Sequence, residues 1–254
     1  MKVRLDELIL QRGLAPSRER AQALVLAGRV LVNEQKVEKS GAGVDDEAVL
    51  RILGEEMPFV SRGGLKLARA IEHWHIDVRG KVCMDIGTST GGFTDCLLQN
   101  GAAQVIAVDT GYGQIDIKLR GDPRVKLLEK TNARYLTVEQ VWLDAAQRTA
   151  IGLIAMDVSF ISATLVLPAV VQTASEDKAT GGFELVVLVK PQFEAGRERI
   201  GKGGIVRDPE AHEMAVQRVS AKVSELGGEG IEVIDSPILG AEGNKEFLLH
   251  ARFG

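Results

Sequence analysis

The chain has 254 residues, of which 45% are apolar and 26% are charged, a composition typical of folded globular proteins. At about 100–200 residues per domain, this length allows one large domain, or a large domain together with a small one. The formal net charge of −4 excludes a uniformly basic coat for nucleic acid and leaves room only for a local basic patch.

The cysteines and the apolar runs set further limits. The two cysteines, Cys83 and Cys96, lie 13 positions apart, which fits neither a disulfide framework nor a CxxC metal site. We therefore expect reduced thiols in a cytoplasmic protein. Residues 1–7 lack the apolar core of a signal peptide, and no apolar run approaches the roughly 18 residues that span a bilayer. We expect no interaction with a membrane.

Residues 1–57 have the pattern of a small α+β domain. The apolar spacing predicts a helix from Leu5 that Gly13 ends. Ser17 is a typical N-cap for a second helix over residues 18–26. Short strands are expected to follow at residues 29–33, 36–37 and 48–53.

Basic residues are concentrated in this first part of the chain. Residues 2–39 hold eight Lys or Arg against five Asp or Glu. A solvated helix surface would account for this excess, but guanidinium groups also match the geometry of phosphate oxygens. The residues that we expect to contact RNA phosphates here are Arg4, Arg12, Arg18 and Arg20.

Several short motifs favour the RNA-binding interpretation. They are Arg4-Leu5-Asp6, Gly13-Leu14-Ala15, Ser17-Arg18, Ala27-Gly28-Arg29-Val30 and Val32-Asn33. Together they resemble the alpha-L RNA-binding module, the S-four type of ribosomal proteins. The resemblance implies an RNA-binding domain at residues 1–57, although Lys39-Ser40-Gly41 departs from the Lys-Pro-Gly turn of that module. Residues 58–80 would then form a linker and a leading helix that continues toward His75.

After Gly80, predicted strands and helices alternate. Near-continuous apolar runs are typical of strands buried on both faces of a parallel sheet. The expected strands are 82–86, 104–108, 125–128, 153–156, 185–189, 231–234 and 246–253, and the expected helices are 94–99, 138–144 and 209–226. No helix separates the last two strands, which predicts a terminal hairpin. The fold class is therefore α/β, with a doubly wound seven-stranded Rossmann-like sheet at residues 81–254 and a small N-terminal α+β domain.

A glycine-rich loop follows the first predicted strand of this sheet. It runs Asp85-Ile86-Gly87-Thr88-Ser89-Thr90-Gly91-Gly92-Phe93 and lies where doubly wound folds bind cofactors. Asp109 ends the next strand, where a carboxylate can accept hydrogen bonds from both ribose hydroxyls of an adenosine. The glycine spacing departs from the G-x-G-x-x-G fingerprint of dinucleotide sites, which disfavours an NAD-type oxidoreductase.

The same loop resembles the first motif of S-adenosylmethionine-dependent methyltransferases. The resemblance implies S-adenosylmethionine as the cofactor, with later loops after the second and third strands closing over the adenine. The cofactor-binding residues that it implies are Asp85, Gly87, Ser89, Thr90, Gly91, Gly92, Phe93, Asp109, Thr110, Gly111, Asn132, Ala133 and Asp157.

Four charged residues occupy places where a reaction centre is expected. Asp157 and Lys190 end the fourth and fifth strands, Glu246 begins the final strand, and Lys66 lies in the leading helix. Each could be a solvated residue at the rim of the sheet. A set of two lysines and two carboxylates could also orient or deprotonate a sugar hydroxyl, since the charges set the geometry and proton affinity of the amines.

These four residues resemble the catalytic set of the FtsJ-like RNA ribose methyltransferases. Nearly the whole chain, through the motifs Ser61-Arg62-Gly63-Gly64-Leu65-Lys66-Leu67, Asp157-Val158-Ser159-Phe160-Ile161-Ser162 and Lys190-Pro191-Gln192-Phe193-Glu194, is similar to the TlyA-type family, also called hemolysin A. The resemblance implies 2′-O-methylation of cytidine in ribosomal RNA, with ribosomal RNA or ribosomal subunits as partners. It also implies Lys66, Asp157, Lys190 and Glu246 as the catalytic residues. The lack of a membrane-spanning segment disfavours a cytolysin, and a catalytically inactive RNA-binding protein is the remaining alternative.

A second basic segment runs from residue 197 to residue 207. It combines four basic residues with three glycines, which is typical of a solvated loop or of a flexible arm on RNA phosphate. The further RNA contacts that we expect are Arg62, Arg197, Arg199 and Lys202. His73 and His75 have no neighbouring ligand cluster, so we predict no metal site.

Overall fold

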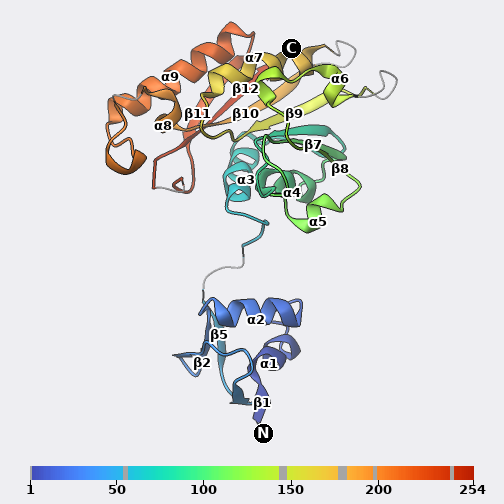
Figure 1. The fold of residues 1–254 in the computed structure, drawn as a ribbon, viewed down its shortest axis with the longest axis vertical. Helices are drawn as coiled ribbons and strands as arrows, with labels where there is room; N and C mark the ends of the chain where they lie inside the picture. Colours follow the sequence, from blue (N-terminus) through green and yellow to red (C-terminus); the bar gives the residue numbers. More distant parts are fainter. Residues whose placement is uncertain (1, 54–56, 143–147, 177–181, 197–198, 241–242) are drawn as a thin grey trace. The chain divides into compact units, whose positions relative to one another are not determined.

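A computed structural model describes the chain except for residues 1, 54–56, 143–147, 177–181, 197–198 and 241–242 and the side chain of Lys202. The chain divides into two compact units, Met1–Glu56 and Met57–Gly254 (Figure 1). Residues 58–80, expected to be a linker and leading helix, lie in the second unit.

The first unit packs two helices and short strands around a small apolar core. Its elements are β1 (Lys2–Arg4), α1 (Leu5–Gln11), α2 (Arg18–Leu26), β2 (Val30–Val32), β3 (Gln35–Lys36), β4 (Gly43–Asp45) and β5 (Leu50–Ile52). Both predicted helices are confirmed, and the Ser17 hydroxyl caps α2 by accepting a hydrogen bond from the Arg20 amide at 3.2 Å. Strands β1 and β4 were not predicted, because each has three residues with one apolar side chain and shows no alternation.

A buried carboxylate connects the elements of this unit through hydrogen bonds. The sequence analysis did not predict it. Asp6 of α1 is 0% exposed. It accepts hydrogen bonds from Arg4 at 2.9 and 3.0 Å, from Arg18 at 3.2 Å and from Gln22 at 2.8 Å. The hydrogen bond from Arg4 is the largest cause that holds the pKa of Asp6 well below its usual range. Asp6 therefore joins β1, α1 and α2.

We expect Asp6→Ala to lower the free energy of unfolding of the first unit by about 1–3 kcal/mol, because the hydrogen bonds that the buried carboxylate accepts are lost. The side chains of Arg4 and Arg18 are 47% and 43% exposed, so water will compensate for part of the loss. Hydrogen exchange of the amides in residues 5–26 of the full chain measures the effect. The exposed Glu47→Ala serves as control, and equal protection in the two variants would contradict the assignment.

The second unit is built on a single large sheet. Its elements are α3 (Gly63–Trp74), β6 (Val82–Ile86), α4 (Gly92–Gln99), β7 (Gln104–Val108), α5 (Ile117–Arg120), β8 (Val125–Leu128), η1 (Ala133–Tyr135), α6 (Val138–Val141), β9 (Ile151–Met156), α7 (Ala163–Ser175), β10 (Phe183–Val189), α8 (Pro191–Glu194), η4 (Lys202–Gly204), α9 (Pro209–Glu225), β11 (Glu229–Asp235) and β12 (Phe247–Phe253). The seven strands lie in the order β11-β12-β10-β9-β6-β7-β8. The strands from β10 to β8 are parallel, whereas β12 pairs antiparallel with both β10 and β11. The predicted doubly wound sheet with a terminal hairpin is confirmed.

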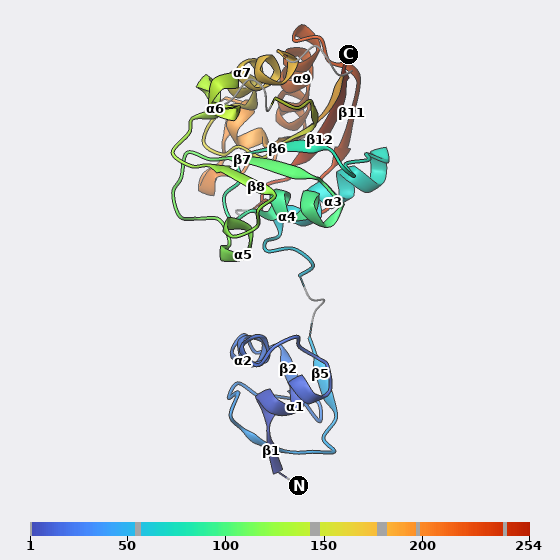
Figure 2. The ribbon, with the colours of Figure 1, turned by 90° about the vertical axis from the view of Figure 1, so that its right-hand side faces the viewer.

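Helices cover both faces of the sheet, with α6, α7 and α9 on one face and α3, α4 and α5 on the other (Figure 2). Alternate residues of the buried strands belong to two separate apolar cores. Met84 of β6 packs in the core that contains residues of α6, α7 and α9. Its neighbour Cys83 packs in the core that contains residues of α3, α4 and α5. Strands that are buried on both faces explain why the apolar runs of the sequence are nearly continuous.

Four helices differ from the prediction, since the four-residue helices α5 and α8 and the longer helix α7 were not predicted and α6 is shorter than expected. Helix α7 was not predicted, because its apolar residues follow those of β9 without a clear period and Pro168 lies inside it. The helix expected over residues 138–144 ends at Val141, with Trp142 already extended, and Asp144 lies outside the described residues. None of the helices in the described ranges has the length and apolarity to cross a membrane.

Candidate active site

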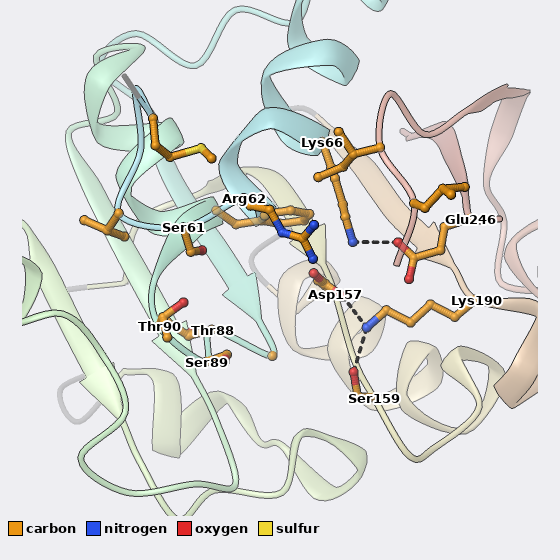
Figure 3. A pocket seen from close by; sticks show the side chains of 18 residues that line it. Ser61, Arg62, Lys66, Thr88, Ser89, Thr90, Asp157, Ser159, Lys190 and Glu246 are labelled. Carbon is orange, nitrogen blue, oxygen red and sulfur yellow. Dashed lines mark hydrogen bonds and ion pairs between the residues drawn. The ribbon is translucent and has the colours of Figure 1, made fainter. Parts of the chain in front are cut away.

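Two cavities open where the central parallel strands end. The first has a volume of about 610 Å³ (Figure 3) and the second about 480 Å³. Gly87 and Ser89, which follow β6, and Asp157 and Ser159, which follow β9, line both cavities. Strands β7 and β8 lie on one side of β6, and β9 and β10 lie on the other. Doubly wound folds bind ligands at such a switch point.

Gly87 brings the loops after β6 and β9 into contact. Its φ of +89° favours glycine, and a Cβ there would lie 2.4 Å from the Asp157 carbonyl oxygen. The backbone of the two loops can therefore approach closely only because this position has no side chain. The Asp157 amide donates a hydrogen bond to the Ile86 carbonyl at 2.8 Å, which fixes the same junction.

Helix α3 carries Lys66 to the first cavity by packing against the start of α4. A Cβ on Gly92 would lie 2.3 Å from the Ser61 Oγ and 2.9 Å from the Gly64 amide nitrogen. Asp95 of α4 accepts a hydrogen bond from the Val60 amide at 2.8 Å. Small residues and this hydrogen bond hold the start of α3 against the glycine-rich loop.

The four residues predicted to be catalytic lie together in two ion pairs. The Lys66 Nζ lies 2.5 Å from the Glu246 Oε2, and the Lys190 Nζ lies 2.6 Å from the Asp157 Oδ1 (Figure 3). Lys66, Lys190 and Glu246 are 8%, 9% and 3% exposed. Four charged groups in a partly desolvated cavity form an electrostatically strong site, because screening by water is weak there.

Ser159 completes the surroundings of Lys190. The Lys190 ammonium donates a hydrogen bond to the Ser159 Oγ at 2.6 Å, beside its ion pair with Asp157. The sequence analysis quoted Ser159 within a motif and gave it no role. A serine in a loop after a buried strand has no signal of its own, and the observed contact with Lys190 reveals its role.

Most residues predicted to bind the cofactor line one of the cavities. Gly87, Ser89, Thr90, Gly92, Phe93 and Asp157 line the first, and Gly87, Ser89, Asp109, Thr110, Gly111, Asn132, Ala133 and Asp157 line the second. Gly91 lines neither of these and is the N-cap of α4, with a φ of +95°. Thr88, Gln114 and Thr131 line a cavity without having been predicted. Each of the three lies next to, or within a few residues of, a predicted one.

Asp109 links two loops at the floor of the second cavity. Its Oδ2 accepts a hydrogen bond from the Ser89 amide at 2.8 Å, and its Oδ1 accepts one from the Gly111 amide at 2.6 Å. The side chain is half-buried at the end of β7. A carboxylate with this placement can receive further hydrogen bonds from hydroxyl groups of a ligand.

Asp85 lies beneath the loop rather than on a cavity wall. It is 0% exposed, and its Oδ2 accepts hydrogen bonds from the Thr94 amide at 2.9 Å and from the Thr94 hydroxyl at 2.6 Å. Its Oδ1 is buried without a hydrogen-bond partner among the described residues. Burial raises the pKa of Asp85 to about 7, opposed by the Thr94 hydrogen bonds and reinforced by the charges of Asp157 and Asp109. Asp85 thus holds the first turn of α4.

We expect Asp85→Asn to stabilise the protein relative to the wild type at pH 8 and to lose this advantage as the pH falls to 5. The pKa of Asp85 is raised from 3.8 in the unfolded chain to about 7 in the folded one. The folded state therefore binds the extra proton between these values, and the wild type gains about 1.4 kcal/mol for each pH unit of acidification in that window. Denaturant unfolding of both proteins at pH 5–8 measures the difference. A difference that does not change with pH would contradict this prediction.

The arginines predicted to contact RNA have partners within the first unit. Arg4 and Arg18 bind Asp6, and Arg12 donates to the Ala48 carbonyl at 2.6 Å and to the Asp46 carbonyl. The side chains of Arg4 and Arg18 are nevertheless 47% and 43% exposed. Their free edges still offer N–H donors, because a guanidinium carries five.

The remaining predicted RNA contacts lie in the second unit. Arg62 is exposed at the N-cap of α3 and points into the first cavity (Figure 3). Arg199 lies 3.3 Å from Asp208 and 3.6 Å from Glu210. Arg197 and the side chain of Lys202 lie outside the described residues.

The basic segment 197–207 is tied to the loop that bears Glu246. Buried Asn244 accepts a hydrogen bond from the Val206 amide at 2.9 Å and donates one to the Gly204 carbonyl at 3.0 Å. Asn244 lies two positions before Glu246. The segment is therefore fixed next to the first cavity at its C-terminal end.

Comparisons with known proteins agree with this architecture. The family model described as FtsJ-like methyltransferase matches residues 59–253, and that of the S4 domain matches residues 3–50. The chain is 43% identical over 252 residues to the 16S/23S rRNA (cytidine-2′-O)-methyltransferase TlyA of Mycobacterium tuberculosis, covering 99% of this chain and 90% of that protein. It is 40% identical to hemolysin A of Brachyspira hyodysenteriae, covering 98% and 99%.

A solved structure is also similar to this chain. A hemolysin from Streptococcus thermophilus matches with a TM-score of 0.73 and 42% identity, covering 99% of this chain and 88% of that chain.

Among the residues that our structure describes, no group of three or more His, Cys, Asp or Glu is arranged to hold a metal ion.

Proposed function

The chain belongs to the FtsJ-like methyltransferase family and carries an S4 domain, and from this premise we propose that it methylates the ribose 2′-hydroxyl of cytidine in ribosomal RNA with S-adenosylmethionine. The observation that carries the proposal is the junction of two cavities at Asp157, next to the Lys190 and Lys66 ion pairs. A methyl transfer requires a donor and an acceptor to meet at one point, and this junction offers such a point.

The second cavity fits the adenosine part of S-adenosylmethionine. Asp109 presents carboxylate oxygens to the cavity, and Gly111 and Asn132 line it beside that carboxylate. Gly87 lines both cavities, and its lack of a Cβ lets the Asp157 backbone approach there. These residues would hold the ribose and adenine, and Ser89 and Asp157 would hold the part that reaches the first cavity. When bound, S-adenosylmethionine supplies an electrophilic methyl group on a sulfonium.

The first cavity would receive the ribose of the RNA. Lys190 would lie closest to the 2′-hydroxyl, either accepting its proton or holding its oxygen by a charged hydrogen bond. Asp157 and Glu246 hold the two lysines through ion pairs of 2.6 and 2.5 Å. Fixing the oxygen in line with the transferred group accounts for much of the acceleration expected of such a site.

The S4 unit would supply affinity for the ribosomal substrate. The exposed parts of Arg4 and Arg18 suit phosphate oxygens, and Arg62 would contact RNA at the rim of the first cavity. We further propose that the protein acts on ribosomal RNA or ribosomal subunits in the cytoplasm.

Incubation with labelled S-adenosylmethionine and separated ribosomal subunits tests the proposal directly. Mapping of the labelled nucleotide should find a 2′-O-methylcytidine. Label on a base rather than on a ribose, or no label with either subunit or with naked ribosomal RNA, would overturn it. Calorimetric titration with S-adenosylmethionine and with NAD separates the methyltransferase from an oxidoreductase.

A further inference from the structure

We infer that Ser159 is a positioning residue that acts through Lys190, aiming the lysine nitrogen at the ribose hydroxyl. This inference rests on the proposed function, because it assumes that the hydroxyl enters the first cavity. It assigns a role to a side chain for which the sequence pattern predicts none. The Lys190 Nζ contacts the Ser159 Oγ at 2.6 Å and the Asp157 Oδ1 at 2.6 Å.

The geometry of an amine explains why two partners matter. A lysine ammonium has three N–H donors around a tetrahedral nitrogen. Ser159 accepts a hydrogen bond from one of these donors, whereas Asp157 attracts the ammonium through its charge, because its Oδ1 makes no hydrogen bond among the described residues. The hydrogen bond to Ser159 and the ion pair with Asp157 together restrict where the nitrogen lies, although the lysine side chain is otherwise long and flexible. Removal of either partner would release the nitrogen to rotate.

The contact with Ser159 serves both charge states of Lys190. In the ammonium, one N–H stays on Ser159 and another can donate a hydrogen bond to the oxygen of the incoming hydroxyl. In the neutral amine, one N–H stays on Ser159 and the lone pair can turn to the hydroxyl hydrogen. If proton transfer follows, the ribose O–H bond breaks while a third N–H bond forms, and the nitrogen keeps its hydrogen bond to Ser159 beside the charge of Asp157.

The surroundings of Ser159 support a role in the site rather than in the fold. Ser159 is exposed and lines both cavities. Among the described residues, Lys190 is the group that its hydroxyl contacts. Ser162, in the same loop, differs because it caps α7 and donates to the buried Glu194 at 2.5 Å. The loop is therefore held by Ser162 and Glu194, and Ser159 is left for Lys190.

The test is a double-mutant cycle in single-turnover methylation of ribosomal subunits by the full-length protein. Ser159→Ala should lower the rate constant by about 10–100-fold, because one hydrogen bond to a charged group is lost. Ser159→Thr, which keeps a hydroxyl, should restore the rate to within about threefold of the wild type. In the Lys190→Ala background, Ser159→Ala should have no further effect beyond about twofold, because Ser159 acts only through Lys190.

A merely structural role would give a different pattern. Ser159→Ala would then reduce the rate by the same factor in the Lys190→Ala background, and its melting temperature or its affinity for S-adenosylmethionine would fall. Either result, or an unchanged single-turnover rate for Ser159→Ala beside an active wild type, would overturn the inference alone. A wild-type protein that transfers no label to ribosomal RNA would overturn the proposed function, and the inference with it.

Discussion

Lys190→Ala is expected to lower the rate of ribose methylation by about 10²–10⁴-fold, the range typical of losing a general base or an equivalent polar group at the reacting atom. Lys190 is 9% exposed and lines the first cavity, and its amine contacts Asp157 and Ser159, which line both cavities. The affinity for S-adenosylmethionine should stay within about threefold, because we place Lys190 against the acceptor.

Lys190→Arg separates the two roles of this lysine. An arginine keeps the charge but stays protonated at any useful pH, so it cannot accept the proton of the hydroxyl. We expect no rescue in single-turnover assays. The matched control is Lys222→Ala on α9, whose side chain pairs with Glu225 outside both cavities. Near wild-type turnover of Lys190→Arg would exclude proton acceptance and leave only electrostatic positioning.

The central sheet was predictable because its strands are buried on both faces. The predicted strands 82–86, 104–108 and 125–128 coincide with β6, β7 and β8. Each is a short run rich in apolar residues, and the runs at β9 and β10 have the same pattern. Helix α7 was not predicted, because its apolar residues follow those of β9 after only a short loop around Asp157. The two elements therefore read as one apolar stretch of sequence.

The candidate site was less accessible to sequence reasoning. Lys66 and Glu246 lie 180 positions apart and meet only in the folded sheet, so spacing alone could not pair them. Lys66 and Glu246 were predicted to be catalytic because of the resemblance to a known family, and that resemblance assigns no role to Ser159. The contacts of Asp6 with Arg4 and Arg18 show a second limit of sequence reasoning. An excess of arginines indicates a phosphate-binding face, but the sequence does not show which of them also hold the domain together.

Asp109→Ala is expected to weaken binding of S-adenosylmethionine by about 10–150-fold, equivalent to the 1.5–3 kcal/mol typical of hydrogen bonds to a charged group. The carboxylate ends β7 at the second cavity, where it would accept hydrogen bonds from the two ribose hydroxyls. The carboxylate also accepts hydrogen bonds from the Ser89 and Gly111 amides, so its removal would take away the hydrogen bonds that hold both loops.

Titration calorimetry of the full-length variant measures this effect, with Asp122→Ala as the matched control. Asp122 lies between α5 and β8, before the amino end of β8, pairs with Arg124 and lines neither cavity. Asp109→Asn keeps one carbonyl oxygen and should lose less affinity than Asp109→Ala, since a single acceptor can still bind one hydroxyl. Equal affinity of the wild type and Asp109→Ala would place the ribose elsewhere. Equal losses in Asp109→Ala and Asp122→Ala would mean that the effect arises from general destabilisation rather than from contact with the ribose.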